Sequence, residues 1–239
     1  MSSSFITLEG SDLQDYVSAV RGQSDSILVF NGDDSVDGVD GDDRVVLGLG
    51  NDTVTIFTQP TAPGFSFGLN GAEIYGDGFP NSQLGGSVDD PIGNDSINIS
   101  LPGREPQVFT GVTSSLLDAG GGADTIYGWN NFIGSSAIGA DGDDSITIAS
   151  SKASVAKGGE GSDTITVGTV SGTTDEFHSI VGGAGADTIT GGEGSDDIVA
   201  EAGDTIDLTE TTGVLDTVQI QAATAGSAVG VAGESFTGF

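Results

Sequence analysis

A nine-residue pattern, Gly-Gly-x-Gly-x-Asp-x-apolar-x, recurs along this chain and limits its possible folds more than any other feature. Complete copies begin at Gly158, Gly182 and Gly191, and partial copies extend back to Asn31. Each copy joins a glycine-rich loop with one carboxylate to a short strand. Because one such unit cannot bury its apolar residue alone, the repeat predicts a stack of copies that share one core.

The residue two positions after each loop aspartate is always β-branched. In a strand this residue faces opposite to its two neighbours, which are mostly threonine and serine. The pattern predicts an all-β fold, a right-handed parallel β-helix. Its interior ladders are expected to contain Val36, Val45, Val54, Ile97, Ile126, Ile146, Ile165, Ile189, Ile198, Ile206 and Val218.

The loop aspartates form two runs with different spacing. The first run has nine-residue intervals and comprises Asp34, Asp43 and Asp52. The second run has intervals of 20, 19 and 24 residues and comprises Asp124, Asp144, Asp163 and Asp187. A short apolar strand with a serine precedes each aspartate of the second run. Each wide coil is therefore predicted to have one metal loop and a plainer turn on its far side.

The tight spacing returns at the C-terminal end of the second run. Asp196 follows Asp187 by nine residues, and a shortened copy begins at Gly203. The positions of Asp204 and Asp216 predict two columns of loops, on opposite edges of the stack.

The segments outside the repeats suggest five regions. Leu13, Tyr16, Val17 and Val20 have helical spacing, which predicts a capping helix over Ser11–Gly22. Residues 1–30 are expected to form an N-terminal cap and residues 31–55 the first repeat run. Residues 56–114 are rich in Phe and Pro and are expected to be an irregular insertion, or strands outside the main stack, with one partial repeat at Asp95. Residues 115–220 form the second run and residues 221–239 the tail.

The charge of the chain predicts cation binding and excludes some partners. The chain has 36 acidic and 5 basic residues, a formal charge of −31. Carboxylates at fixed offsets from apolar residues are typical of sites that fill with metal as the chain folds. The scattered Lys and Arg argue against nucleic acid. There is no cysteine and no apolar run long enough to insert in a membrane. The N-terminal sequence also does not resemble a cleavable signal peptide.

Calcium is the cation that these loops fit best. It takes six to eight oxygen ligands and accepts carboxylates together with backbone carbonyls. Glycine allows the backbone to turn tightly and to aim its carbonyls inward. About half a dozen ions are expected, given six or more oxygens each. The predicted metal ligands are the carbonyls of Gly139, Gly158, Gly182 and Gly191 and the carboxylates of Asp34, Asp43, Asp52, Asp95, Asp124, Asp144, Asp163, Asp187, Asp196 and Asp204.

These loops resemble the RTX family, whose calcium-binding nonapeptide repeats form β-rolls in bacterial proteins exported by type I secretion. The resemblance covers Asn31–Thr55 and about Ser115–Val218. It implies that two nonapeptides make one β-roll turn and that the loop aspartate is a calcium ligand. It also implies an extracellular protein, exported through an uncleaved C-terminal signal. The wide coils depart from the family's regular 18-residue turn.

Two other motifs suggest different functions. Gly64–Gly68 matches Gly-x-Ser-x-Gly, and a single His178 follows it. A nucleophile elbow needs a strand before it and a helix after it, whereas here Pro63 precedes and more glycines follow. We therefore expect no enzyme. The pairs Thr53/Thr55, Thr164/Thr166 and Thr188/Thr190 could instead form an outward array of hydroxyl groups.

Three functional hypotheses follow. The first is a secreted structural protein that binds copies of itself, as a filament, an S-layer or a matrix subunit. The second is a calcium-dependent adhesive module that binds a cell-surface glycan or ice through its threonine face. The third is an enzyme or the accessory module of a secreted enzyme.

Overall fold

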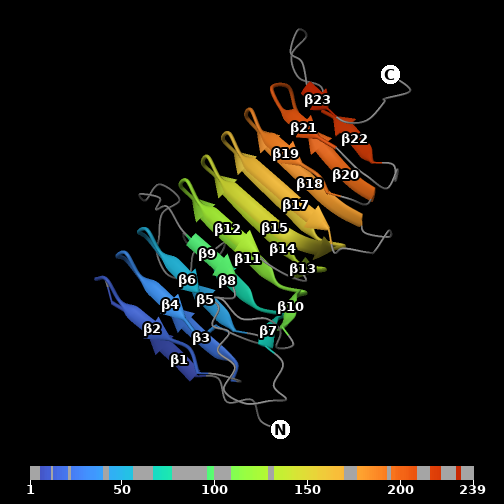
Figure 1. Ribbon diagram of the computed structural model, residues 1–239. Coiled ribbons are helices and arrows are strands. Elements are labelled where there is room, and N and C mark those ends of the chain that lie inside the picture. The colour runs from blue at the N-terminus through green and yellow to red at the C-terminus, as the bar shows by residue number, and fades with distance from the viewer. Residues whose placement is uncertain are drawn as a thin grey trace.

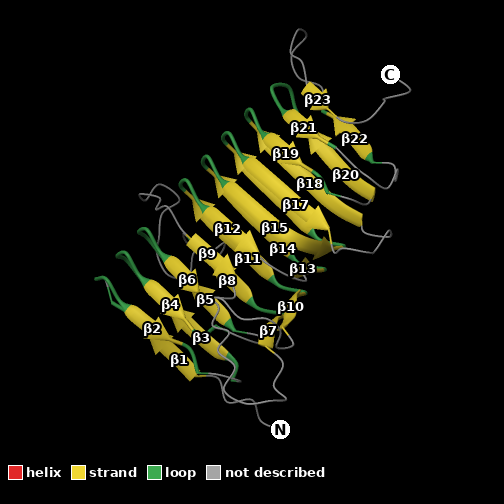
Figure 2. Cartoon of the chain, in the orientation of Figure 1, coloured by secondary structure: helices red, strands yellow, loops and turns green. Residues whose placement is uncertain are grey.

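The protein is a stack of β-strands wound into two facing parallel sheets (Figure 1). The computed structural model describes residues 6–11, 13–20, 23–39, 43–55, 67–76, 96–99, 109–128, 132–169, 177–192, 195–208, 216–221 and 230–232. Every regular element within these ranges is a strand (Figure 2). None of the described residues forms a helix that could cross a membrane.

The chain alternates between the two sheets as it climbs the stack. Sheet A contains, in spatial order, β1 (Ile6–Glu9), β3 (Asp25–Leu28), β5 (Arg44–Val46), β8 (Glu73–Tyr75), β11 (Leu116–Gly121), β14 (Ser136–Asp141), β16 (Val155–Glu160), β18 (Phe177–Ala184), β20 (Ser195–Ala200) and β22 (Thr217–Ile220). Sheet B contains β2 (Tyr16–Ser18), β4 (Ser35–Asp37), β6 (Thr53–Thr55), β9 (Ser96–Ile99), β12 (Thr125–Gly128), β15 (Ser145–Lys152), β17 (Thr164–Thr169), β19 (Thr188–Thr190), β21 (Thr205–Asp207) and β23 (Gly230–Ala232). The predicted all-β parallel solenoid is confirmed.

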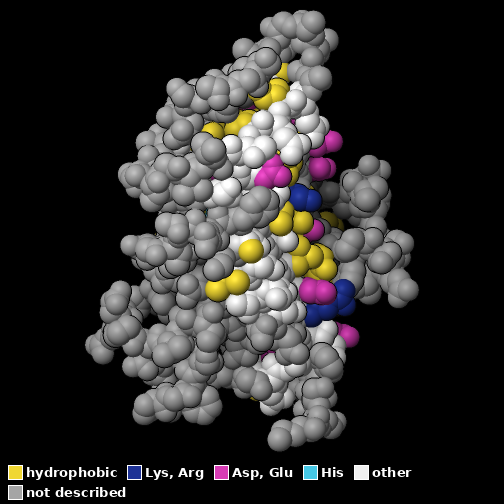
Figure 3. All heavy atoms as spheres, turned by 90° about the vertical axis from the view of Figure 1, so that its right-hand side faces the viewer, with side chains coloured by type: hydrophobic (Ala, Val, Ile, Leu, Met, Phe, Trp, Pro, Cys, Tyr) yellow, Lys and Arg dark blue, Asp and Glu magenta, His cyan; other side chains and the backbone are white. Residues whose placement is uncertain are grey.

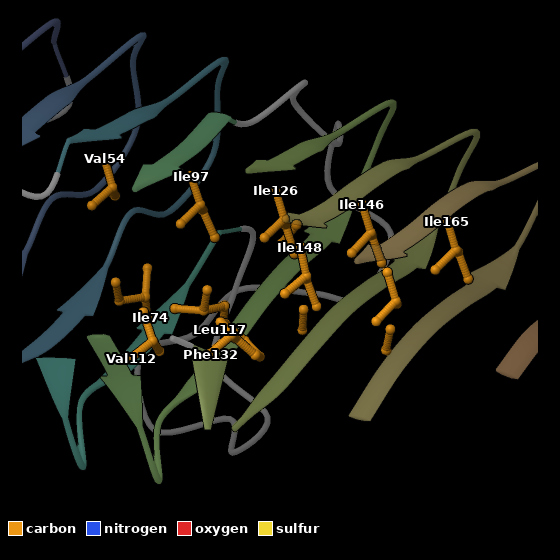
Figure 4. Packing of buried hydrophobic residues seen from close by; sticks show 14 of the residues in the cluster. Val54, Ile74, Ile97, Val112, Leu117, Ile126, Phe132, Ile146, Ile148 and Ile165 are labelled. Atoms are coloured by element: carbon orange, nitrogen blue, oxygen red, sulfur yellow. The ribbon is translucent and has the colours of Figure 1, made fainter. Parts of the chain in front are cut away.

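The core consists of two ladders of apolar side chains that meet between the sheets. Ten of the eleven predicted interior residues are at most 1% exposed, and Val218 is partly buried against the same cluster. Figure 4 shows Val54, Ile97, Ile126, Ile146 and Ile165 in one row. Sheet A presents the facing row, in which Leu117, Ala137 and Ala156 occupy the central coils. The Asp-x-apolar rule therefore identified the row of sheet B, whereas these central residues of sheet A were not predicted because a serine takes the place of the aspartate before them.

The predicted capping helix at the N-terminal end is wrong. Residues 16–18 form β2, which pairs in parallel with β4. Leu13 and Tyr16 are 73% and 70% exposed, while Val17 packs against the core. Asp15-Tyr16-Val17 follows the same Asp-x-apolar rule as the later coils, and the parallel pairing of that strand outweighs the weak helical spacing.

The region between the two repeat runs contributes to the stack as well. β8 lies between β5 and β11 in sheet A, and β9 lies between β6 and β12 in sheet B. Three further strands lie off this path: β7 (Phe67–Asn70) and β13 (Phe132–Ile133) both pair with β10 (Phe109–Thr113). Ala72 occupies the position before β8 that Asp43 holds before β5, which is why the sequence did not reveal this coil.

Candidate metal centre

The turns at the two edges of the stack form two columns. The first column lies where the chain passes from sheet A to sheet B. By strand register it contains Asp15, Asp34, Asp52, Asp124, Asp144, Asp163, Asp187 and Asp204. The second column, on the opposite edge, contains Asp25, Asp43, Ala72, Ser115, Ser135, Ser154, His178, Asp196 and Asp216.

Six of the eight carboxylates of the first column accept a backbone N–H from the coil before them. The backbone N–H of Asp124 donates to Oδ1 of Asp144 at 2.9 Å, and that of Asp144 donates to Oδ1 of Asp163 at 2.9 Å. The same bond joins Asp163 to Asp187 at 2.9 Å and Asp187 to Asp204 at 3.0 Å. One carboxylate oxygen therefore fixes the stacking of adjacent coils and leaves the other available.

The second carboxylate oxygen is buried without a hydrogen bond. This holds for Oδ2 of Asp34, Asp144, Asp163 and Asp187, considering the residues that the structure describes. A buried anionic oxygen that lacks a donor is costly unless a cation reaches it. Burial is the main cause that raises the pKa of Asp52, Asp163 and Asp187 to about 6, although a backbone N–H lowers each value.

The first glycine of the repeat leaves room for this oxygen. A Cβ at Gly139 would lie under 3.0 Å from both Oδ2 of Asp144 and the carbonyl oxygen of Gly158. A Cβ at Gly158 would lie equally close to Oδ2 of Asp163 and the carbonyl oxygen of Gly182. A carboxylate oxygen and a carbonyl oxygen from consecutive coils thus converge over one glycine. This is the mixed oxygen environment that Ca²⁺ accepts.

The third glycine of the repeat has a backbone role. Gly161 has φ +130° and approaches the carbonyl oxygen of Gly142 in the preceding coil so closely that a Cβ would collide with it. Only glycine combines this left-handed conformation with such an approach. The loop carbonyls therefore stack in register with the carboxylates.

The ligands of an ion in these loops must be mostly backbone oxygens. No three acidic or histidine side chains gather at one point in the described ranges. One coil supplies a single carboxylate, and the carbonyl oxygens come from two coils. The residues that would hold an ion are therefore brought together only when the coils stack. The first-column loops fit calcium, which would bridge consecutive coils and neutralise the buried carboxylates.

The second column is different in its centre. Ser115, Ser135 and Ser154 replace the aspartate there, and Ser135 Oγ accepts the N–H of Ser115 at 3.1 Å. The hydroxyl also donates to loop carbonyls. Ser135 Oγ lies 3.1 Å from the carbonyl oxygens of both Val112 and Ile133, which share its one proton, and Ser154 Oγ donates to that of Phe132 at 2.7 Å. Serine therefore fills both hydrogen-bonding roles without a cation, in agreement with the predicted plainer turns.

Carboxylates return in the second column at both ends of the stack. Asp25 N donates to Oδ1 of Asp43 at 2.8 Å, and Asp196 N donates to Oδ1 of Asp216 at 2.9 Å. A Cβ at Gly191 would lie 3.0 Å from Oδ2 of Asp196, an oxygen that accepts the N–H of Gly192 at 3.3 Å. The centre of this column thus separates two acidic ends.

The structure places the predicted ligands in these two columns. Asp43, Asp196 and Gly191 lie in the second and the others in the first, except Asp95, which lies outside the described residues. Their role as calcium ligands stays a prediction. Sequence reasoning missed Asp15 and Asp25 and left Asp216 out of the ligand set. Asp25 precedes Asp34 by nine residues and is followed by Ser26 and Ile27, so the repeat rule could have found it.

The fold and the loops together define a calcium-stabilised parallel β-roll. A family model of the RTX calcium-binding nonapeptide repeat matches residues 24–54, 113–131 and 179–206, in four copies. These matched segments are therefore RTX calcium-binding nonapeptide repeats. Arrays of these repeats bind several calcium ions, so Ca²⁺ is the cofactor, and they are typical of secreted proteins. No curated protein and no solved structure matched the chain.

Substitution of Gly158 by alanine tests whether the oxygens that converge at this glycine bind calcium. Gly158 has no left-handed φ, so the effect of Gly158→Ala is steric: its Cβ displaces Oδ2 of Asp163 and the Gly182 carbonyl. We expect at least one fewer calcium ion by isothermal titration and a lower melting temperature in calcium. Gly128→Ala is the matched control, because its Cβ would meet nothing closer than 3.5 Å. Equal calcium stoichiometry in the two variants would show that the oxygens at Gly158 do not bind calcium.

The stabilisation by calcium is expected to shrink as pH falls from 7 to 5. Folding raises the pKa of Asp52, Asp163 and Asp187 from the ordinary value to about 6. Protonation of these groups therefore stabilises the metal-free fold, fully below their ordinary pKa, and this stabilisation is lost as pH rises through 6. Protons also compete with calcium for the same oxygens. Melting curves with calcium and with chelator at both pH values test this. A difference in melting temperature that is independent of pH would contradict it.

Proposed function

We propose that this chain is a secreted calcium-binding structural protein that assembles with copies of itself outside the cell, as a filament, S-layer or matrix subunit. The observation that carries this proposal is the continuous stack from β1 to β23, which uses the described strands of all five sequence regions. The RTX β-roll is a structural calcium-binding fold rather than a known catalytic one. Ser66 of the Gly-x-Ser-x-Gly motif lies outside the described residues.

The ends of the two sheets favour association. β1 and β2 end the described sheets on one side, and β22 and β23 end them on the other. Edge strands present backbone groups that can pair with another chain. Pairing between opposite ends is head-to-tail and does not close, which produces filaments. Calcium would control the assembly, because it is scarce in the cytosol and abundant outside.

Sedimentation and electron microscopy in calcium test this function. We expect large assemblies in calcium that dissolve in chelator. A folded chain that remains monomeric at high concentration in calcium would overturn the proposal.

A second candidate is an adhesive module that binds a glycan or ice, and one observation favours it. Ser and Thr occupy one outward rank of sheet B on eight consecutive strands, in register: Ser35, Thr53, Ser96, Thr125, Ser145, Thr164, Thr188 and Thr205. An insoluble-glycan pull-down and ice-affinity partitioning test it. Binding that is lost in Thr164→Lys and kept in Ser179→Lys, on the other sheet, would favour this function.

A further inference from the structure

The outer face of sheet A carries apolar side chains together with charges of both signs, in a chain whose formal charge is −31. Two outward ranks run across its strands. One rank contains Arg44, Glu73, Leu116, Ser136, Val155, Ser179 and Asp197. The other contains Val46, Tyr75, Asp118, Ile138, Lys157, Val181 and Val199.

This face combines apolar side chains with most of the described cations. Leu116, Ile138, Val155, Val181 and Val199 are half-buried by their neighbours, while Val46 and Tyr75 are already buried within the chain. Of the three described Lys and Arg residues, Arg44 and Lys157 lie here. Figure 3 shows hydrophobic side chains in several patches, with basic and acidic groups beside them. Exposed apolar side chains next to charges of both signs allow this surface to contact a protein of complementary pattern.

We propose that two copies of this chain pack the outer faces of sheet A together, related by a two-fold axis along β14. This proposal rests on the proposed self-assembly and names one of its contacts. This axis runs between the two copies, parallel to β14. It places each strand of one copy opposite the strand of the other copy that lies equally far from β14 on the other side. A residue of one rank then faces a residue of the same rank. β11 of one copy then faces β16 of the other, and β5 faces β20.

The charges on this face become complementary under that axis. Lys157 on β16 faces Asp118 on β11 of the second copy, because both belong to the same rank one strand from the axis. Arg44 on β5, which pairs with Glu73 within the chain at 3.2 Å, also faces Asp197 on β20 of the second copy, three strands from the axis. Burial raises the pKa of Asp118, so this half-buried carboxylate gains from a cation. Both cations of the face therefore meet a carboxylate.

The apolar residues become complementary as well. Ile138 faces Ile138 of the second copy on the axis, and Leu116 faces Val155 of the second copy. Other positions of the axis lose these matches. An axis between β11 and β14 places Lys157 opposite Tyr75, and an axis between β14 and β16 places it opposite Ile138. An axis on β16 places Lys157 opposite itself.

The size of the contact predicts a weak dimer. Strand spacing of about 4.8 Å across the seven strands that carry the two ranks gives about 700 Å² in total, the size of a weak, transient contact. Face-to-face sheets pack about 10 Å apart, which side chains of this size span. Association is therefore expected to depend on protein concentration.

Analytical ultracentrifugation of the full chain in calcium tests the contact. Ile138→Glu places two carboxylates against each other on the axis and is expected to weaken dimerisation by at least about tenfold. Thr147→Glu, on the outer face of sheet B, is the matched control and should leave it unchanged. Lys157→Asp and Asp118→Lys should each weaken the dimer, and the double variant should restore it. Circular dichroism in calcium confirms that each variant folds.

Cross-linking provides an independent measurement, because the chain has no cysteine. With a short bismaleimide, Ile138→Cys should give a covalent dimer and Thr147→Cys should not. Assemblies that persist in Ile138→Glu, together with no cross-link in Ile138→Cys, would overturn this contact and leave self-assembly standing. A cross-linked dimer that never grows larger would support this contact and overturn the proposed assembly.

Discussion

Removal of calcium at neutral pH is expected to unfold the β-roll. Carboxylates one coil apart in the first column repel one another by about 3 kcal/mol per pair, for a spacing of about 4.8 Å and an effective dielectric near 20. Burial of one Val or Ile stabilises the fold by about 1.5–3 kcal/mol, and each coil has few such residues. The repulsion therefore offsets much of what each coil gains from its core.

Far-UV circular dichroism during a calcium titration measures this effect. We expect little β signal in chelator and a cooperative gain as calcium is added, because each ion needs two stacked coils. Magnesium at the same concentration is the control for ionic strength, since it demands a smaller, octahedral site. A full β signal in chelator at pH 7.5 would show that the stack folds without calcium and would contradict this prediction.

Substitution of Asp163 by asparagine is expected to have the largest effect of any single change. The amide oxygen can still accept the N–H of Asp144, which the carboxylate accepts at 2.9 Å. The substitution removes the anionic Oδ2 that is buried without a donor. We expect fewer bound ions and a folding midpoint at roughly tenfold higher calcium, since loss of one charged ligand costs on the order of 1–3 kcal/mol.

The control for this variant is Asp207→Asn, which makes the same change of charge on the exposed side of β21. Isothermal titration gives the number of ions and their affinity, and circular dichroism gives the folding midpoint. If the two variants shifted the calcium midpoint equally, net charge would explain the effect and the first column would not be the binding site.

The interior and the loop carboxylates could be predicted because both follow from one local rule. The spacing Asp-x-apolar places the aspartate at the turn and the β-branched residue in the core, as Asp163 and Ile165 show. The same rule applied to Asp15 and Val17 would have predicted β2. Over a segment of about ten residues, however, the apolar positions can also match a helix, and the local sequence does not distinguish a helix from a strand.

The pairing of the coils could not be predicted with the same certainty. Intervals of 20, 19 and 24 residues leave open which turns stack, because the extra residues can enter at either edge. The stack includes Ala72 in the second column, although its coil has no aspartate there. Backbone hydrogen bonds between coils decide such positions, and these bonds depend on no particular side chain.

The sequence by itself determined the kind of fold, the metal and the residues that face the core, because the nonapeptide encodes these locally. Only the tertiary structure decided how the repeats divide into columns. It showed serine hydroxyls closing the centre of the second column, where their protons satisfy the loop carbonyls. It also aligned Asp118, Ile138 and Lys157 on one face of sheet A. These three residues lie about 20 positions apart, and only the parallel register brings them side by side.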